Sequence, residues 1–306
     1  MSNVFSGIDS LPRGYASDNV TKGCLVLEGG AFRAIYEEGI IDLFLQRGIN
    51  FECVIGVSAG AMNGVNYVAG QIGRSARINL RYRHDPNYVG VKPLFTDGGV
   101  IGFDYIFGEL PHVEPLDYVR LKDKRWRLLC TATDVRTGKP VYFENGFQKD
   151  FFQCVRASAS MPYISQPVQV NDGIFLDGGC SCNIPYQWAI DQGYEKIVVI
   201  KTRDRFYRDP EIGPRQKTII DRMYKMYPQF AETLKNMSER YNRELDELDY
   251  LDKIGRVFLM TPSEPLNIGR LEPDMEKLGG IYYLGRDDIL ARWKEFEAYM
   301  GQSFPG

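Results

Sequence analysis

The sequence predicts an α/β fold with a largely parallel central sheet. Short apolar runs such as CLVLEGG (24–30), FECVIGVS (51–58) and KIVVIKT (196–202) alternate with segments of helical spacing. Continuous apolar runs of this length are typical of buried strands, and the intervening helices provide the crossovers that parallel strands need. The alternation therefore predicts strand–helix–strand units in which most strands run in the same direction.

The other elements of this predicted domain continue the alternation. They are helices near 35–45, 59–70, 147–160 and 185–193, two strand-like runs within 125–144, and a strand at 173–179. A loop-rich insertion at about 81–118 interrupts them. We expect a polar N-terminal segment at 1–23 and an α/β domain at 24–203.

From about 204 the pattern changes. The stretch 215–250 is rich in charged residues and has helical spacing, a strand is predicted at 256–262, and a helix around 287–300 closes the chain. We therefore expect 204–306 to be a mostly helical extension packed on the domain at 24–203.

The composition is that of an ordinary globular protein, with 306 residues of which 44% are hydrophobic and 25% charged. A formal net charge of −3 gives no indication of a nucleic-acid partner. The first twenty residues are polar and lack the apolar core of a signal peptide, and no later stretch approaches the roughly 18–20 apolar residues that span a bilayer. We expect a cytoplasmic protein; its oligomeric state is not predicted.

Six cysteines are present without a CxxC pair, and three of them lie in apolar, strand-like runs. Free buried thiols in a reducing compartment explain this distribution better than disulfides do. Cys180 and Cys182 are close enough in sequence to suggest a metal site, but the chain has only two histidines and no second cluster. We expect neither a metal nor a cofactor.

Ser58 is the first candidate catalytic residue. It is the central residue of a GxSxG motif formed by Gly56, Val57, Ser58, Ala59 and Gly60, between a predicted strand and a predicted helix. This context is that of a nucleophile elbow, a tight turn that lifts the serine hydroxyl clear of the backbone. The motif alone is common enough that a glycine-lined, serine-capped turn would also explain it.

A second candidate feature lies one strand earlier. The run LEGGAFRA places Gly29, Gly30, Ala31, Phe32 and Arg33 between a strand and a helix, where backbone N–H groups can bind negative charge. Acyl transfer needs such donors for its oxyanion, and Arg33 adds a positive charge. A dinucleotide fingerprint is disfavoured because alanines replace the second and third glycines of GxGxxG.

Asp177 is the candidate base. It ends an apolar strand in the run FLDGGCSCNIP, and Gly178 and Gly179 allow the chain to turn beside it. An ordinary aspartate with a pKa of about 3.9 is a poor base, so burial would have to raise its proton affinity. His84 and His112 lie in polar, loop-like stretches and precede Asp177, unlike the histidine of an ordinary hydrolase triad. A Ser–Asp dyad is therefore favoured.

Asp97 belongs to a second DGG run and competes with Asp177 for the role of base. It lies within the loop-rich insertion and is followed by a turn and a new element. A turn residue that tolerates unusual backbone angles is the better explanation for it.

Together, these stretches resemble the patatin-like phospholipase family. The resemblance covers roughly 24–203 and comprises EGGAFRA, GVSAG, the run ASASMPYISQPVQV and DGGCSCNIP, which is similar to the family's aspartate motif with its trailing Asn183 and Pro185. The chain departs from the family at Ala31 and Ala34, where glycines are usual.

The resemblance implies a three-layer α/β/α fold and a lipid acyl hydrolase. In such an enzyme Ser58 is the nucleophile, Asp177 is the proton acceptor, and backbone amides around Gly29–Phe32, with Arg33 nearby, form the oxyanion hole. Two alternatives remain: a regulatory protein with weak or no turnover, which the altered oxyanion stretch permits, and an acyltransferase that uses an alcohol acceptor.

The predicted helical stretch at 215–250 suggests a membrane contact. From Arg215 to Arg243 it carries seven Lys or Arg against three Asp or Glu, with Met, Tyr and Phe between them. Such a helix could contact lipid head groups or cover the acyl pocket. A helix packed on the domain with a solvated face is the alternative, because the following run RELDELDYLDK is acidic.

Overall fold

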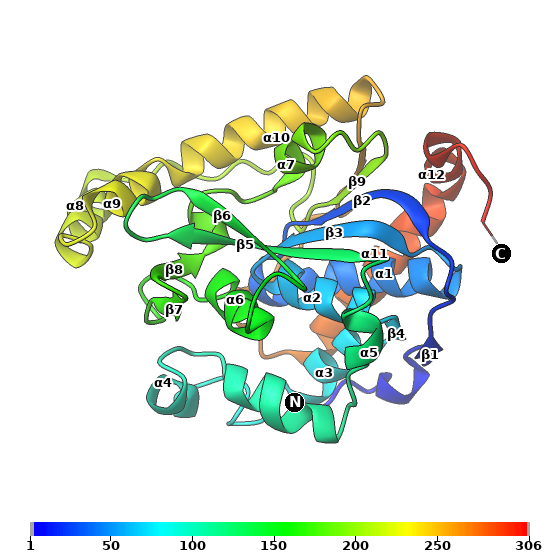
Figure 1. The fold of residues 1–306 in the computed structure, drawn as a ribbon, viewed down its shortest axis with the longest axis horizontal. Helices are drawn as coiled ribbons and strands as arrows, with labels where there is room; N and C mark the ends of the chain where they lie inside the picture. The colour runs from blue at the N-terminus through cyan, green and yellow to red at the C-terminus, as the bar shows by residue number, and fades with distance from the viewer. Residues whose placement is uncertain (1–2, 305–306) are drawn as a thin grey trace.

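The computed structural model describes residues 3–304, and within them an eight-stranded sheet forms the centre of the molecule (Figure 1). Its order is β10–β9–β2–β3–β5–β8–β7, and β6 pairs with β5 outside this path. The strands are β2 (Thr21–Leu27), β3 (Phe51–Val57), β5 (Arg127–Asp134), β6 (Pro140–Glu144), β7 (Val168–Val170), β8 (Gly173–Asp177), β9 (Ile197–Ile200) and β10 (Phe258–Met260). The pairs from β10 to β5 are parallel, and those of β6, β7 and β8 are antiparallel. The predicted, largely parallel sheet is confirmed.

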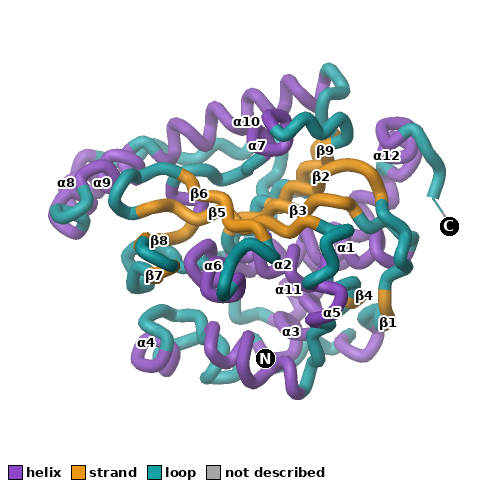
Figure 2. The backbone as a smooth tube through the Cα atoms, in the orientation of Figure 1, coloured by secondary structure: helices purple, strands orange, loops and turns teal. Residues whose placement is uncertain are grey.

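Helices cover both faces of the sheet, which gives the three layers that the family resemblance implies (Figure 2). One face carries α1 (Ile35–Gln46), α2 (Ala59–Val68) and α11 (Met275–Ala291), and the other carries α7 (Tyr186–Asp191) and α10 (Met237–Lys253). Side chains of β2 alternate between the two cores: Leu25 contributes to the first and Val26 to the second. Because both faces are buried, the strand is a continuous apolar run.

The region after residue 204 belongs to the same core. β10 extends the sheet beside β9, and α11 packs along α1. The two helices approach closely at Gly39 and Gly285: a Cβ on Gly39 would overlap the Tyr282 carbonyl oxygen, and one on Gly285 would overlap that of Tyr36. Only glycine permits this reciprocal contact between the two backbones.

Several elements differ in extent from the sequence prediction. The helical stretch 215–250 is three helices, α8 (Pro214–Met223), α9 (Pro228–Lys235) and α10, and the closing helix is α12 (Trp293–Met300), which follows α11 directly. Pro228 starts a new helix because it lacks an N–H and cannot continue the preceding one.

The long helix α11 was missed in large part, because only its end overlaps the helix predicted around 287–300. The other elements that the sequence did not predict are short or lie near the insertion. They are β1 (Gly14–Tyr15), β4 (Gln71–Ile72), α3 (Arg74–Tyr82), β7, and the helices of the insertion, namely α4 (Lys92–Thr96), a π-helical turn (Tyr105–Glu109), a 3-10 turn (Leu110–His112) and α5 (Tyr118–Leu121). The predicted helix at 147–160 is α6 (Phe151–Ser158). Among the helices of residues 3–304, none has the length and hydrophobicity that crossing a membrane requires.

The contact between α1 and α11 generates a stability prediction. Gly285→Ala should lower the free energy of unfolding by about 1–3 kcal/mol, because the new methyl group overlaps the Tyr36 carbonyl. Gly280→Ala, in the same helix but with open space around its Cβ position, should leave stability unchanged or raise it by up to about 1 kcal/mol. Urea denaturation of both variants measures the difference, and equal effects would contradict the close-contact explanation.

Candidate active site

Ser58 occupies a strained turn between β3 and α2. Its backbone angles are φ 55° and ψ −125°, in a region that a residue with a side chain rarely adopts. The flanking glycines are needed for close backbone packing: a Cβ on Gly56 would lie 2.5 Å from the Gly60 carbonyl carbon, and one on Gly60 would lie 2.6 Å from the Leu27 carbonyl oxygen. The turn thus has the geometry of a nucleophile elbow.

The end of α6 supports both candidate catalytic residues. The Ser58 N–H donates to Ser158 Oγ at 3.0 Å, and the Asp177 N–H donates to the Ser160 carbonyl at 2.8 Å. The sequence predicts no role for the serines of this run, ASASMP. A short polar run at the end of a helix gives no local signal that it will hold two distant strand ends together.

Asp177 ends β8, which approaches Ser58 from the direction opposite to β3. β5 pairs with both strands: Thr131 is in register with Val57, and the next residue, Ala132, is in register with Asp177. β5 therefore continues past the end of β3 and pairs there with the end of β8. This register brings the two candidate residues together at the carboxyl ends of β3 and β8.

The Asp177 carboxyl is buried but has hydrogen-bond donors. Its Oδ1 accepts from the Gly179 N–H at 2.8 Å, and its side chain also interacts through a hydrogen bond with Ser58. Burial raises the pKa of Asp177 from 3.8 to about 6, against the opposing effects of these two hydrogen bonds and the more distant charge of Arg270. A carboxylate with this pKa is a stronger base than an exposed aspartate, yet it is ionised at neutral pH.

The glycine-rich stretch after β2 contains three consecutive residues of positive φ: Gly29 at 82°, Gly30 at 113° and Ala31 at 54°. The Gly29 N–H donates to Glu37 Oε1 at 2.7 Å, and the Phe32 N–H donates to the Arg270 carbonyl at 3.3 Å.

The remaining backbone amides of the two turns beside Ser58 differ in whether they have an acceptor. The Arg33 N–H has one, because it donates to the Gly30 carbonyl at 3.3 Å. Between residues 3 and 304, the N–H groups of Gly30, Ala31 and Ala59 have no hydrogen-bond acceptor, so they are available to a ligand beside Ser58.

Ser58 borders two pockets of different character. The larger, of about 930 Å³ and open to solvent, contains charged residues, among them Arg33, Asp177 and Arg203. The smaller, of about 510 Å³, is mostly apolar and includes Phe32 and Phe103. Its charge-free lining suits a hydrocarbon chain.

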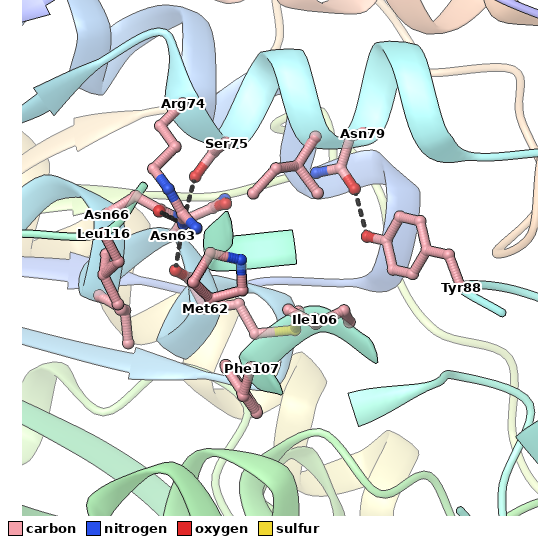
Figure 3. Close-up of a pocket in the computed structure, with 13 residues that line it drawn as sticks. Met62, Asn63, Asn66, Arg74, Ser75, Asn79, Tyr88, Ile106, Phe107 and Leu116 are labelled. Atoms are coloured by element: carbon pink, nitrogen blue, oxygen red, sulfur yellow. Dashed lines mark hydrogen bonds between the residues drawn. The ribbon is translucent and has the colours of Figure 1, made fainter. Parts of the chain in front are cut away.

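The apolar pocket adjoins a further compartment, drawn in Figure 3, with which it shares Met62, Asn63, Asn79 and Tyr88. Ile106, Phe107 and Leu116 line that compartment, together with a hydrogen-bonded set of polar side chains. Arg74 donates to Asn66 at 2.5 Å, and Asn66 donates to Ser75 at 2.7 Å. The loop-rich insertion thus supplies part of the wall beyond the apolar pocket.

The competing candidates lie elsewhere. His84 Nε2 is hydrogen-bonded to the Pro273 carbonyl at 2.8 Å, and neither His84 nor His112 lines either pocket beside Ser58. Asp97 accepts from the Asp104 N–H at 2.8 Å and pairs with Arg156 at 3.5 Å. The structure thus brings Asp177, and not Asp97, to Ser58.

The buried carboxyl of Asp177 generates a pH-dependent prediction. Its pKa is higher in the folded state than in the unfolded state, so ionisation costs stability, beginning near pH 3.8 and fully expressed above about pH 6. Asp177→Asn should therefore raise the free energy of unfolding by about 1–3 kcal/mol at pH 8 and have little effect at pH 4.

Denaturant titrations at the two pH values measure this difference. Asp172→Asn removes the same charge from an exposed turn and serves as the control. A stabilisation by Asp177→Asn that is equal at pH 4 and pH 8 would show that buried charge is not its cause.

The comparisons with known proteins agree with this geometry. The family model described as patatin-like phospholipase matches residues 25–190, and a model for a domain of unknown function, DUF6363, matches residues 227–301. Among curated proteins, the chain is 26% identical over 268 residues to the uncharacterised protein YjjU of Escherichia coli, covering 86% of this chain and 74% of that protein.

Two further relatives and one solved structure extend the comparison. The lysophospholipase nte1 of Aspergillus terreus is 27% identical to this chain, and the match covers 52% of this chain and 10% of that protein. An uncharacterised NTE family protein of Mycobacterium bovis is 24% identical, and the match covers 56% of this chain and 46% of that protein. The crystal structure of VipD from Legionella pneumophila matches with a TM-score of 0.52 at 15% identity, covering 93% of this chain and 70% of that one, and so supports the fold alone. With more than half of its length matched by the family model, the chain belongs to the patatin-like phospholipase family.

Proposed function

We propose that this protein is a serine hydrolase that cleaves carboxylic esters of lipids with a Ser58–Asp177 dyad. Membership of the patatin-like phospholipase family and the lysophospholipase relatives support lipid hydrolysis in general. The observation that carries the specific proposal is the placement of two side chains in one pocket: a serine on a strained elbow beside a buried aspartate whose pKa is raised to about 6.

The proposed reaction has two halves. Asp177 takes the Ser58 proton as Ser58 Oγ attacks the ester carbonyl, and the protonated Asp177 then returns this proton to the departing alcohol oxygen. Water attacks the acyl-serine in the second half, again with Asp177 as base, and releases the carboxylic acid and free Ser58. No histidine is needed, because one carboxylate exchanges the proton in both halves.

Backbone amides would stabilise the oxyanion in both halves. We propose the N–H groups of Gly30, Ala31 and Ala59, because the amides of Gly29, Phe32 and Arg33 already donate to other groups. Alanine carries an N–H just as glycine does, so Ala31 retains the donor. Its φ of 54° is one that an L-residue adopts only at a cost, which the surrounding loop must offset.

The acyl chain is assigned to the apolar pocket beside Ser58. This pocket is lined on one side by the oxyanion stretch and on another by residues of the insertion, including Ile101 and Phe103. Hydrocarbon transferred from water into such a site gains about 25 cal/mol per Å² of buried surface, so chain length should affect KM. The alcohol part of the ester would then face the polar pocket.

Active-site variants test the dyad. Ser58→Ala and Asp177→Asn should each lower kcat for a short-chain p-nitrophenyl ester by at least roughly a thousandfold, because each removes a group that acts in both halves. A fluorophosphonate probe should label the wild type and leave Ser58→Ala unlabelled. Ser158→Cys, which keeps a weak acceptor for the Ser58 N–H, should retain labelling and serves as a control for the fold.

The same assay separates the alternatives. A wild-type protein that neither labels nor hydrolyses any ester would be a regulatory member of the family without turnover. Labelling followed by transfer of the acyl group to added glycerol, with little free acid formed, would identify an acyltransferase. Hydrolysis by Ser58→Ala at the wild-type rate would overturn the assignment of the nucleophile.

We further propose a peripheral membrane contact, centred on α8 within the stretch 215–250. Met223 and Met226 are 53% and 84% exposed, and the neighbouring cations Arg215, Lys217 and Arg222 form no ion pair within residues 3–304. Phe230, which the spacing placed near these methionines, is fully buried and takes no part. Exposed methionines beside free cations are a combination suited to an anionic lipid surface.

Vesicle flotation tests the membrane contact. The wild type should float with phosphatidylglycerol vesicles, and the double variant Met223→Ser/Met226→Ser should bind about tenfold more weakly because it loses apolar burial. Tyr250→Ser/Ile254→Ser removes two exposed apolar side chains, one in the last turn of α10 and one directly after it, and should bind like the wild type. Equal binding by both double variants would exclude α8 as the contact.

A further inference from the structure

The polar pocket beside Ser58 contains three arginines that no carboxylate neutralises by direct contact. They are Arg33, Arg203 after β9, and Arg270 in the link between β10 and α11. None of the three forms an ion pair within the described residues, although the pocket also contains Glu28, Asp177 and Asp209. Two of the arginines, Arg203 and Arg270, lie outside the span 25–190 that the family model matches.

The acidic residues of the pocket take their hydrogen bonds from neutral groups. Glu28 accepts from the Thr202 N–H at 2.5 Å and from the Tyr241 hydroxyl. Asp209 accepts from the Tyr207 hydroxyl at 2.6 Å and from Ser238 Oγ at 2.8 Å. These acceptors are thus already engaged by donors other than arginine.

The guanidinium groups, by contrast, have donors to spare. The Arg33 side chain is buried, with 8% of the residue exposed, and its Nε has no hydrogen-bond acceptor. Burial lowers the pKa of Arg33, and the nearby positive charge of Arg203 lowers it further. A buried cation without a hydrogen-bonded anion is costly, and an anion bound in the pocket would remove that cost.

The position of these cations relative to Ser58 defines what part of a substrate they would meet. Ala31, Ser58 and Met161 line both the polar and the apolar pocket. With an acyl chain in the apolar pocket and its carbonyl carbon at Ser58, the alcohol part of the ester extends into the polar pocket. The arginines would therefore contact the leaving group and not the acyl chain.

We propose that Arg203 and Arg270, together with Arg33, form an anion-binding subsite that selects acyl esters whose alcohol part carries a phosphate monoester. Phosphate suits the subsite because several oxygens can accept from separate guanidinium groups. A quaternary ammonium is disfavoured: the Tyr207 ring, which could bind such a cation, already has the Arg203 guanidinium 4.2 Å from its centroid. The inference rests on the proposed hydrolase function and specifies its substrate.

Three esters with the same acyl chain test the selectivity: a 1-acylglycerol 3-phosphate, the uncharged 1-acylglycerol and the corresponding phosphocholine ester. In the wild type, kcat/KM should be highest for the phosphate monoester. In Arg203→Gln and Arg270→Gln, the ratio of kcat/KM for the phosphate ester to that for the uncharged ester should fall about tenfold each. The ratio is the readout because Arg270 also affects the Asp177 base, which acts on all three substrates.

Arg208→Gln is the matched control. Arg208 is close in sequence to Arg203 but pairs with Asp246 at 2.5 Å and does not line the pocket. This variant should keep the wild-type ratio. An unchanged ratio in both Arg203→Gln and Arg270→Gln would overturn the subsite. Arg270 is exposed, so its substitution tests the proposal even if Arg203→Gln fails to fold.

A binding experiment on Ser58→Ala separates the subsite from the hydrolase assignment. By titration calorimetry, this variant should bind dodecyl phosphate more tightly than dodecyl maltoside, and adding Arg270→Gln should remove the preference. This result supports the subsite even if the wild type hydrolyses none of the three esters. Absence of hydrolysis would refute only the proposed function. Equal binding of the two amphiphiles would overturn the subsite. If inorganic phosphate binds as tightly as dodecyl phosphate, the subsite recognises a free anion, and the proposal that it selects a lipid substrate is overturned.

Discussion

The register of β5 with its two neighbours is the constraint on which the candidate site depends. β5 pairs in parallel with β3 and then, one residue beyond the β3 end, in the opposite direction with β8. Ser58 therefore leaves the sheet where Asp177 arrives. A shift of two residues in either pairing would displace the carboxylate by about 7 Å along the strand, beyond the reach of a hydrogen bond.

The close approach of backbones around this junction explains the glycines that frame both residues. A Cβ on Gly178 would overlap the Thr131 carbonyl, and one on Gly60 would press against the Leu27 carbonyl. The same tight packing excludes water from Asp177 and raises its pKa. Strain at Ser58 and desolvation at Asp177 are thus two consequences of one arrangement, and each of them reduces the stability of the fold.

Patterns that span a whole element could be predicted from the sequence. Buried strands read as apolar runs, and Ser58 and Asp177 could be found because each follows such a run in a glycine-rich context. Ser158 could not be predicted as the acceptor for the Ser58 N–H, since it lies 100 residues away and carries no motif. The sequence could not single out the proposed amide donors of Gly30, Ala31 and Ala59 either, because that choice depends on the acceptors that the N–H groups of Gly29, Phe32 and Arg33 find in the fold.

Helix boundaries and tertiary partners could not be predicted from the sequence. The stretch 215–250 has continuous helical spacing, yet the chain turns before Pro228 and again near Asn236, so Phe230 faces the core while Met226 faces solvent. Spacing identifies the faces of a single straight helix only. No sequence pattern predicts that Arg203 and Arg270 lie in the same pocket as Ser58, because their positions depend on β9, β10 and the link that follows β10.

The region after residue 204 is therefore part of the candidate site as well as of the core. Tyr241 of α10 donates to Glu28 at the start of the glycine-rich stretch, and the Arg270 carbonyl accepts from the Phe32 N–H of the same stretch. The close contact of α11 with α1 holds the chain segment that carries Arg270. Loosening that contact would disturb the glycine-rich loop and the cations of the polar pocket together, so the stability of the C-terminal region and the geometry of the candidate site are physically coupled.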